Sequence, residues 1–230
     1  FNMVNLGIDT LEFDNALGTH TVIAVSGGEV QFDLADTNDN ARSYSISGTG
    51  TTDTLTFDLN GVDVGGGAMT FTGIETLTIA TSGTAVMDGA STMTATAATE
   101  KLIITGTAGT LSLGNLTLDQ IDSTGFTGTS ITYGTMQQMT LFTGGSSAET
   151  IIGSSAADTL SGGAGADFLQ TQAVTLDDAA NNILTGGAGF DTFTLVGDSD
   201  GAATNYLGSA QITDFTVGTS AANTDLIRFS

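Results

Sequence analysis

The sequence has no cysteine, no proline and no tryptophan, and it has only three basic residues. The lack of cysteine excludes a disulfide framework, so an exported chain of this kind needs another means of stabilisation, and bound metal ions are one. A zinc site with several protein ligands is excluded as well, because His20 is the only histidine. Without proline, the breaks between secondary-structure elements must come from Gly, Asn, Asp and Ser.

The scarcity of basic residues also restricts the partners. The chain has three Lys and Arg residues and 25 Asp and Glu residues, which gives a formal net charge of −22. Binding to nucleic acid or to anionic lipid needs basic side chains, so neither is expected. No apolar run approaches the ~18 residues of a membrane helix, and no membrane span is expected. Charge alone is most simply interpreted as a solubilising surface, although so many carboxylates also suit a hard cation such as Ca²⁺.

What the sequence does contain is a strand-like pattern along nearly its whole length. Short runs rich in Thr, Val, Ile, Leu and Phe alternate apolar with polar residues and are bounded by Gly-containing breaks, which predicts an all-β fold. One phrase recurs, an acidic residue followed by Thr and an apolar residue, as in Asp53-Thr54-Leu55, Glu75-Thr76-Leu77 and Asp158-Thr159-Leu160. Internal repetition of this kind is typical of stacked architectures.

Three segments are predicted. Residues 1–72 are an irregular β-rich part that forms either a sandwich-like module or loose rungs of a β-helix. Residues 73–143 carry apolar anchors at Leu77, Ile103, Ile121 and Leu141, and their separations suit irregular rungs of a parallel β-helix. Residues 144–230 hold a regular array and two closing strands.

The array divides into frames of nine residues that begin at Gly144, Gly153, Gly162, Asp177 and Gly186, with Thr171–Leu176 as a six-residue insertion. Position eight of each frame is apolar and begins a short strand whose side chain enters the core: Ile151, Leu160, Leu169, Leu184 and Phe193. Position six offers a side-chain oxygen: Glu149, Asp158, Asp167, Asn182 and Asp191. The early glycines permit tight turns that aim backbone carbonyls at one point, where the position-six carboxylate supplies charge. Such turns can hold Ca²⁺ between them.

This pattern resembles the G-G-x-G-x-D-x-U-x repeat of the RTX family, a calcium-loaded parallel β-roll. Gly162–Leu169 and Gly186–Phe193 match it in full, whereas the other frames lack some or all of the glycines. The resemblance implies that successive turns alternate sides, with Glu149, Asp167 and Asp191 on one side and Asp158 and Asn182 on the other. About two or three array calcium ions are expected, the strongest between the Asp167 and Asp191 turns. The implied metal-site residues are Gly144, Glu149, Gly153, Asp158, Gly162, Gly163, Gly165, Asp167, Asn182, Gly186, Gly187, Gly189 and Asp191.

The wider layout carries a second resemblance. Gln211–Phe215 and Asp225–Phe229 are similar to the strands that close RTX arrays in proteins exported by type I secretion. Thr72–Ile79, Glu100–Gly106, Leu118–Gly125 and the array follow the order of the carboxy-terminal, lattice-forming region of RTX-type surface-layer (S-layer) proteins of Gram-negative bacteria.

This second resemblance implies a secreted structural protein at the bacterial cell surface that assembles with itself under calcium, with a surface polysaccharide as a further candidate partner. Two alternatives stay open, a calcium-dependent adhesin and the RTX appendage of a type I-secreted hydrolase. No enzyme activity is expected in this segment, because it has no nucleophile-and-base constellation, no H-E-x-x-H and no P-loop.

Overall fold

The computed structural model describes residues 2–3, 10–13, 19–23, 27–32, 43–50, 52–59, 69–82, 92–94, 101–107, 109–113, 116–134, 136, 141–172, 181–196, 210–218 and 224–230. These residues form twenty β-strands that belong to three sheets. Every strand pairing among them is parallel. The fold is therefore a parallel β-solenoid, and the expected all-β, β-helix class is confirmed.

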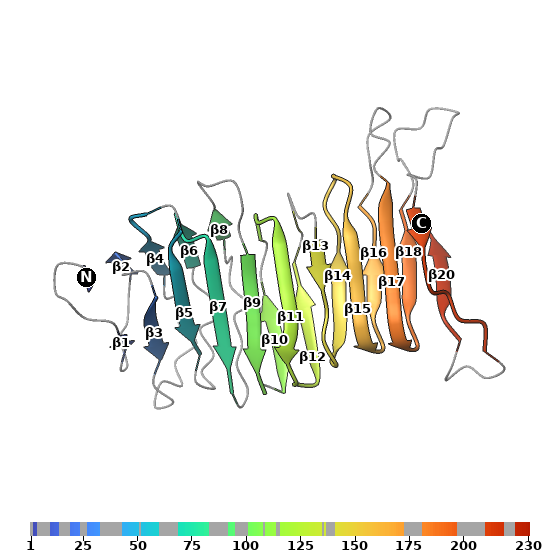
Figure 1. Cartoon of the computed structure of the whole chain (residues 1–230), viewed down its shortest axis with the longest axis horizontal. Coiled ribbons are helices and arrows are strands. Elements are labelled where there is room, and N and C mark those ends of the chain that lie inside the picture. Colours follow the sequence, from blue (N-terminus) through green and yellow to red (C-terminus); the bar gives the residue numbers. More distant parts are fainter. Residues whose placement is uncertain are drawn as a thin grey trace.

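The longest sheet has ten strands and runs the length of the molecule (Figure 1). Its strands are β1 (Thr10–Phe13), β3 (Gly28–Phe32), β5 (Thr54–Asp58), β7 (Thr76–Thr81), β9 (Lys101–Gly106), β11 (Gln120–Phe126), β13 (Leu141–Thr143), β15 (Thr159–Gly165), β17 (Asn182–Gly189) and β19 (Ala210–Ile212). Neighbours in this sheet are alternate strands of the chain, which is the mark of a coil that returns to the same face once per rung.

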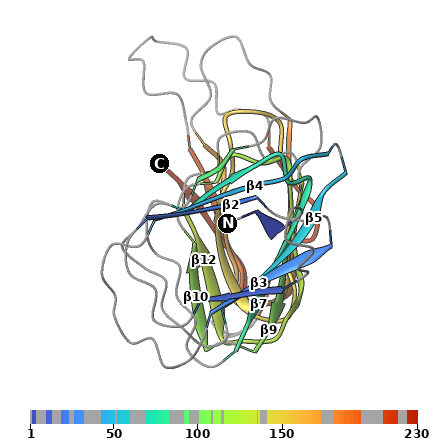
Figure 2. The same cartoon turned by 90° about the vertical axis from the view of Figure 1, so that its left-hand side faces the viewer.

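The intervening strands of the chain form two shorter sheets. The four-stranded sheet comprises β2 (Thr19–Ile23), β4 (Ser43–Ser47), β6 (Met69–Thr72) and β8 (Thr92–Thr94). The six-stranded sheet comprises β10 (Thr110–Leu113), β12 (Ser130–Tyr133), β14 (Ala148–Ile152), β16 (Phe168–Gln170), β18 (Thr192–Leu195) and β20 (Leu226–Phe229). Figure 2, which looks along the solenoid, shows these strands and the ten-stranded sheet enclosing one interior.

The core follows the period-two alternation of the strands. β5 and β7 alternate buried residues with more exposed ones, and the buried residues are Leu55 and Phe57 in β5 and Leu77, Ile79 and Thr81 in β7. Position eight of every array frame is buried with at most 1% of its side chain exposed, as expected: Ile151, Leu160, Leu169, Leu184 and Phe193. Aromatic pairs such as Tyr133 and Phe142, with ring centroids 5.4 Å apart, fill the interior between the two faces.

Two of the expected anchors face the wrong way. Ile103 is only half-buried, whereas Leu102 and Ile104 on either side of it are fully buried. Leu141 is 39% exposed, and its neighbour Phe142 takes the core position. In both strands consecutive apolar residues hide the alternation, so the sequence allows either of two registers, and a shift of one residue exchanges the faces.

The described strands of residues 1–72 are rungs rather than a separate sandwich. β1, β3 and β5 belong to the ten-stranded sheet, and β5 continues into it by pairing with β7.

Two rungs of the array differ in length because of the six-residue insertion. Glu149 and its equivalent Asp167 are 18 residues apart, whereas Asp167 and Asp191 are 24 residues apart. Residues 173–176 of that insertion lie outside the described residues.

Candidate metal centre

The position-six residues lie at or just before the starts of strands, on two opposite edges of the roll. Glu149, Asp167 and Asp191 each precede a pairing position of the six-stranded sheet, where Thr150, Phe168 and Thr192 are in register. Asp158 and Asn182 precede the register partners Thr159 and Ile183 of the ten-stranded sheet. The alternation of sides expected for the array is therefore the one that the structure has.

On the first edge a fourth acidic residue continues the series. Leu226 is in register with Thr192, which places Asp225 one rung beyond Asp191. We call Glu149, Asp167, Asp191 and Asp225 the carboxylate column. Sequence reasoning did not include Asp225 among the site residues, although it is an acidic residue directly before the apolar residues Leu226 and Ile227 of a strand.

One hydrogen bond recurs along the column. The backbone N–H of Glu149 donates to Asp167 Oδ1 at 2.8 Å, and that of Asp167 donates to Asp191 Oδ1 at 2.9 Å. The backbone N–H of Asp191 then donates to Asp225 Oδ1 at 3.0 Å. Asp167, Asp191 and Asp225 are thus each anchored by Oδ1 to the turn before them, and Oδ2 of Asp167 and of Asp191 is left for another partner.

Those second oxygens are buried without a partner. Glu149 Oε2, Asp167 Oδ2 and Asp191 Oδ2 have no backbone, hydroxyl or basic donor as a partner, and their residues are 1%, 2% and 0% exposed. The carboxyl groups of Glu149 and Asp167 lie close enough to share a hydrogen bond, which they can form only when one of them is protonated. A buried carboxylate oxygen in this state is costly unless a positive group meets it. Among the residues that the structure describes, the one ion pair joins Lys101 to Asp122, with 2.8 Å between Nζ and Oδ2, so no basic side chain serves the column.

Burial also perturbs the acidity of these groups. It raises the pKa of Glu149 and of Asp167, and the adjacent Asp167 carboxylate raises the pKa of Glu149 further. Burial raises the pKa of Asp191 to about 6, with contributions from the charges of Asp167, Asp225 and Asp214. The column therefore favours either protons or a bound cation over bare negative charge.

The glycines of the first edge leave the room that the carboxylates occupy. A Cβ on Gly162 would lie 2.3 Å from Asp167 Oδ2, and a Cβ on Gly186 would lie 2.3 Å from Asp191 Oδ2. Gly163 and Gly187 have φ of 101° and 99°, a region that L side chains rarely adopt. Gly144 has the same role of close approach, because its Cβ would lie 1.8 Å from the carbonyl oxygen of Gly162.

The opposite edge is closed by its own hydrogen bonds. Asp158 Oδ2 accepts from the backbone N–H of Ser154 at 2.7 Å, and Asp158 Oδ1 accepts from Ser154 Oγ at 2.9 Å. The backbone N–H of Asp158 donates to Asn182 Oδ1 at 2.9 Å, as in the column. Burial raises the pKa of Asp158 to about 6, but both of its carboxylate oxygens have partners. Ser154, which sequence reasoning did not single out, is the residue that distinguishes this turn.

The remaining residues expected at the metal site lie in these same turns. Gly153 stands beside Asp158, with a hypothetical Cβ 2.6 Å from its Oδ2. Gly165 and Gly189 have φ of 147° and 145° and pair with each other across β15 and β17. Among the described residues, no three acidic or histidine side chains form a ready-made metal cluster. A cation here would therefore combine carboxylates from the column with backbone carbonyls of the glycine turns, and hard oxygen-binding ions suit that donor set.

The family model for the RTX calcium-binding nonapeptide repeat, in four copies, matches residues 143–171 and 177–199. The array is an RTX repeat array. The match covers the turns that hold Glu149, Asp158, Asp167 and Asp191 and ends before Asp214 and Asp225. Comparison of the chain with curated proteins and with solved structures gave no match.

RTX repeats typically bind calcium, and the proteins that carry them are generally exported and extracellular. The unpartnered oxygens and the glycine turns of this chain fit that ion. Within the described residues, no helix is long and apolar enough to cross a membrane.

Proposed function

We propose that this chain is a calcium-dependent structural protein of the bacterial cell surface, exported by type I secretion, whose folded solenoid assembles with copies of itself into an S-layer lattice. One observation carries the calcium dependence: three consecutive buried carboxylates of the RTX array, Glu149, Asp167 and Asp191, each keep an oxygen without a partner. The proposal assigns the chain no catalytic role.

Calcium would act by linkage to folding. Without a cation, the buried charges of the column repel one another and favour the open chain. Extracellular calcium sites bind at about 10⁻⁴–10⁻³ M, so millimolar calcium outside the cell fills them while the low-calcium cytoplasm does not. An ion that binds only the folded array stabilises it, and export in an unfolded state is then followed by folding at the surface.

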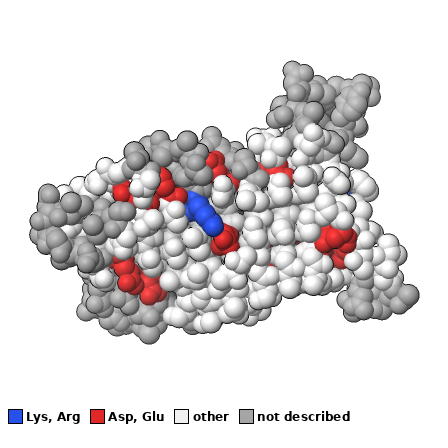
Figure 3. All heavy atoms as spheres, in the orientation of Figure 1, with Lys and Arg blue, Asp and Glu red and all other residues white. Residues whose placement is uncertain are grey.

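Two features support assembly of the folded chain. The face of the ten-stranded sheet is broad, and Figure 3 shows it with few charged groups over the described rungs. Its outward positions carry small hydroxyl side chains in register, such as Thr143, Ser161, Thr185 and Thr213. Such a face can pack against another copy with little cost in desolvated charge. The adhesin and the hydrolase appendage remain the alternative functions.

The test is circular dichroism with negative-stain electron microscopy on metal-stripped protein, before and after addition of 5–10 mM CaCl₂ (about the concentration that saturates such sites). MgCl₂ at equal ionic strength is the control, because Mg²⁺ demands a tighter octahedral shell. A gain of β-signal with ordered sheets supports the proposal. A gain of β-signal without assembly transfers support to the adhesin or the appendage. No response to calcium refutes the calcium dependence itself.

A further inference from the structure

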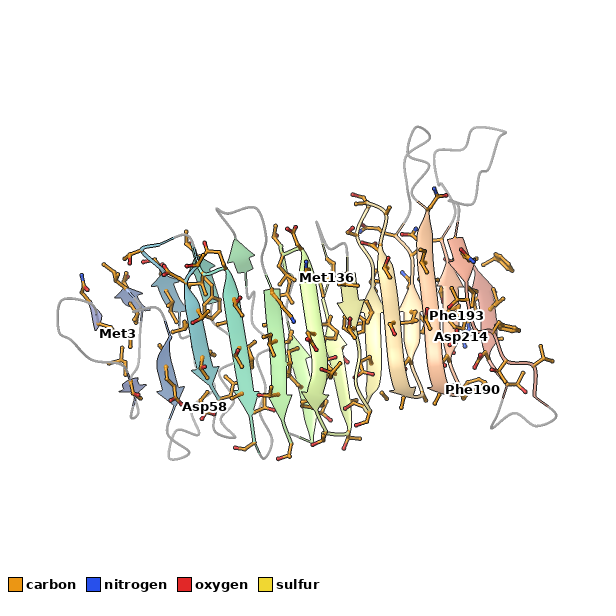
Figure 4. The ribbon with its side chains drawn as sticks, viewed as in Figure 1. Met3, Asp58, Met136, Phe190, Phe193 and Asp214 are labelled. Carbon is orange, nitrogen blue, oxygen red and sulfur yellow. The ribbon has the colours of Figure 1, made fainter. Side chains whose placement is uncertain are left out.

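The segment after the repeats continues both faces of the roll. β19 pairs with β17, and β20 pairs with β18, although the RTX match ends at residue 199. Between them, the described residues 213–218 and 224–225, which we call the closing turn, lie on the edge of the carboxylate column. Figure 4 shows Asp214 at this end of the solenoid, the same end as Phe190 of the last repeat turn. This closing turn carries two acidic residues that no repeat supplies.

Asp225 has the same position relative to Asp191 as Asp191 has relative to Asp167, one rung further along the column. The hydrogen bond from the backbone N–H of Asp191 to Asp225 Oδ1 is 3.0 Å, against 2.9 Å one rung earlier. Asp225 is 6% exposed, and its other oxygen, Oδ2, accepts from the backbone N–H of Thr216 at 2.8 Å. The geometry that joins two repeat turns is thus reproduced between a repeat and a segment that is 34 residues further along the chain and has no repeat pattern.

Asp214 takes the place of a turn glycine. Thr213 lies beside Thr185, with 2.7 Å between their hydroxyl oxygens, so Asp214 is the equivalent of Gly186. Its carboxylate accepts from the backbone N–H groups of Gly186 at 2.9 Å and Gly187 at 2.6 Å. The last repeat turn therefore has the negative charge of Asp214 beside it, in addition to that of Asp191.

Asp191 itself shows that the arrangement is incomplete. Its Oδ2 is fully buried and accepts no hydrogen bond, while the carboxylates of Asp225 and Asp214 lie against the same turn, where they accept from the backbone N–H groups of Asp191, Gly186 and Gly187. Without a cation, the carboxylates of Asp225 and Asp214 would make the buried negative charge of Asp191 still less favourable. A divalent cation at this position accounts for all three.

We propose that the closing segment builds one further calcium site, between the last repeat turn, Gly186–Asp191, and the closing turn. The unpartnered Oδ2 of Asp191 is its carboxylate ligand, and the carboxylates of Asp225 and Asp214, both held by backbone N–H groups, add negative charge beside it. Backbone carbonyls of the two turns complete the shell. This inference rests on the proposed calcium dependence of the array. Its consequence is that docking of β19 and β20 onto the roll depends on calcium, because the ion lies between the closing segment and the last repeat.

The experiment counts bound calcium ions in the full chain by native mass spectrometry across a calcium titration. Asp225→Asn keeps an oxygen for the Asp191 N–H but removes the charge, and it is expected to bind one ion fewer than the unaltered chain. Asp58→Asn, on β5 and far from the array, removes the same charge and is expected to bind the full number. An unchanged ion count in Asp225→Asn overturns the inference while leaving the proposed function intact. An unaltered chain that binds no calcium overturns both.

A second variant covers the case in which Asp225→Asn does not fold. Asp214→Asn keeps an acceptor for the two glycine N–H groups and is expected to require more calcium to fill the last site, with the number of ions at saturation unchanged. Hydrogen exchange of the backbone N–H of Ser230, which donates to Leu195 O at 3.1 Å, reports separately on docking of β20. It should become protected only when the last ion binds. Protection at the same calcium concentration in Asp214→Asn and the unaltered chain would overturn the inference.

Discussion

The two edges of the roll should respond differently to the same substitution. Asp167 and Asp158 occupy the same frame position and are 2% and 1% exposed. Asp167 Oδ2 has no partner, whereas both oxygens of Asp158 are hydrogen-bonded within the turn by Ser154. Replacing either residue by Asn conserves shape and removes one charge. We therefore expect Asp167→Asn to abolish most of the calcium response and Asp158→Asn to leave it nearly unchanged.

The magnitude follows from the position of Asp167 in the column. It lies between Glu149 and Asp191 and so borders two inter-turn spaces. At a calcium concentration of about 100 times the dissociation constant, each bound ion stabilises the folded state by ~2.7 kcal/mol. Loss of two ions therefore removes ~5 kcal/mol of calcium-dependent stability. Asp158 borders the turn of Asn182, but both of its carboxylate oxygens already accept hydrogen bonds from Ser154. Asp158→Asn should therefore change this quantity by less than ~1 kcal/mol.

The assay is urea unfolding followed by circular dichroism, with each variant measured in EDTA and in excess calcium. The difference between the two conditions is the calcium-dependent free energy of unfolding, and it cancels any effect of the substitution on the metal-free fold. Equal losses in the two variants would refute the reasoning from unpartnered oxygens. An unaffected Asp167→Asn variant would refute it as well.

Two other predictions concern the turn backbone and pH. Gly187→Ala should destabilise the calcium-loaded roll by more than the ~1–2 kcal/mol of its left-handed conformation, because its Cβ would also lie 1.8 Å from Gly163 O. Gly109→Ala, with nothing within 4 Å of its Cβ, should change thermal stability by less than ~0.5 kcal/mol, and equal effects would contradict the geometry. In metal-free protein, carboxyls with raised pKa stay protonated in the fold after the unfolded chain has released its protons. Stability in urea should therefore be highest below pH ~4 and fall as pH rises through about 6, the pKa of Asp158 and Asp191. Asp191→Asn should reduce this pH dependence. A free energy of unfolding that rises from pH ~4 to beyond pH ~6 would contradict the prediction.

The array was predictable because its period is fixed. Nine residues make half a rung, so position eight must enter the core and successive frames must fall on opposite edges, which is how the structure places Leu160 and Leu169. Residues 1–143 were harder, because their rungs vary in length. Thr54 pairs with Thr76, but Thr76 pairs with Lys101, so no single period describes both steps. There, runs of consecutive apolar residues such as Leu102-Ile103-Ile104 leave the inward register to be decided by packing.

Two parts of the site could not be predicted from local sequence. Asp225 belongs to the carboxylate column only because β20 pairs with β18, and its turn has none of the early glycines that mark a repeat. The closure of Asp158 depends on where the Ser154 hydroxyl lies in the folded turn, which the frame GSSAADTLS does not specify. Pattern identifies which residues recur, whereas the partners of each oxygen are a property of the three-dimensional arrangement.

The hydrogen bonds of the column all run in one direction along the chain. Each N–H of Glu149, Asp167 and Asp191 is satisfied by a carboxylate that comes later in the chain and is therefore synthesised after it. In the column, the backbone N–H of each turn therefore has its hydrogen-bond partner only when the next turn is in place, and the closing segment supplies the partner for the last repeat turn. A truncation that removes Asp225 would leave the backbone N–H of Asp191 without a hydrogen-bond partner. If the last repeat turn then opened, the N–H of Asp167 would lose its partner in turn, so the roll would unfold from its carboxyl end toward its amino end.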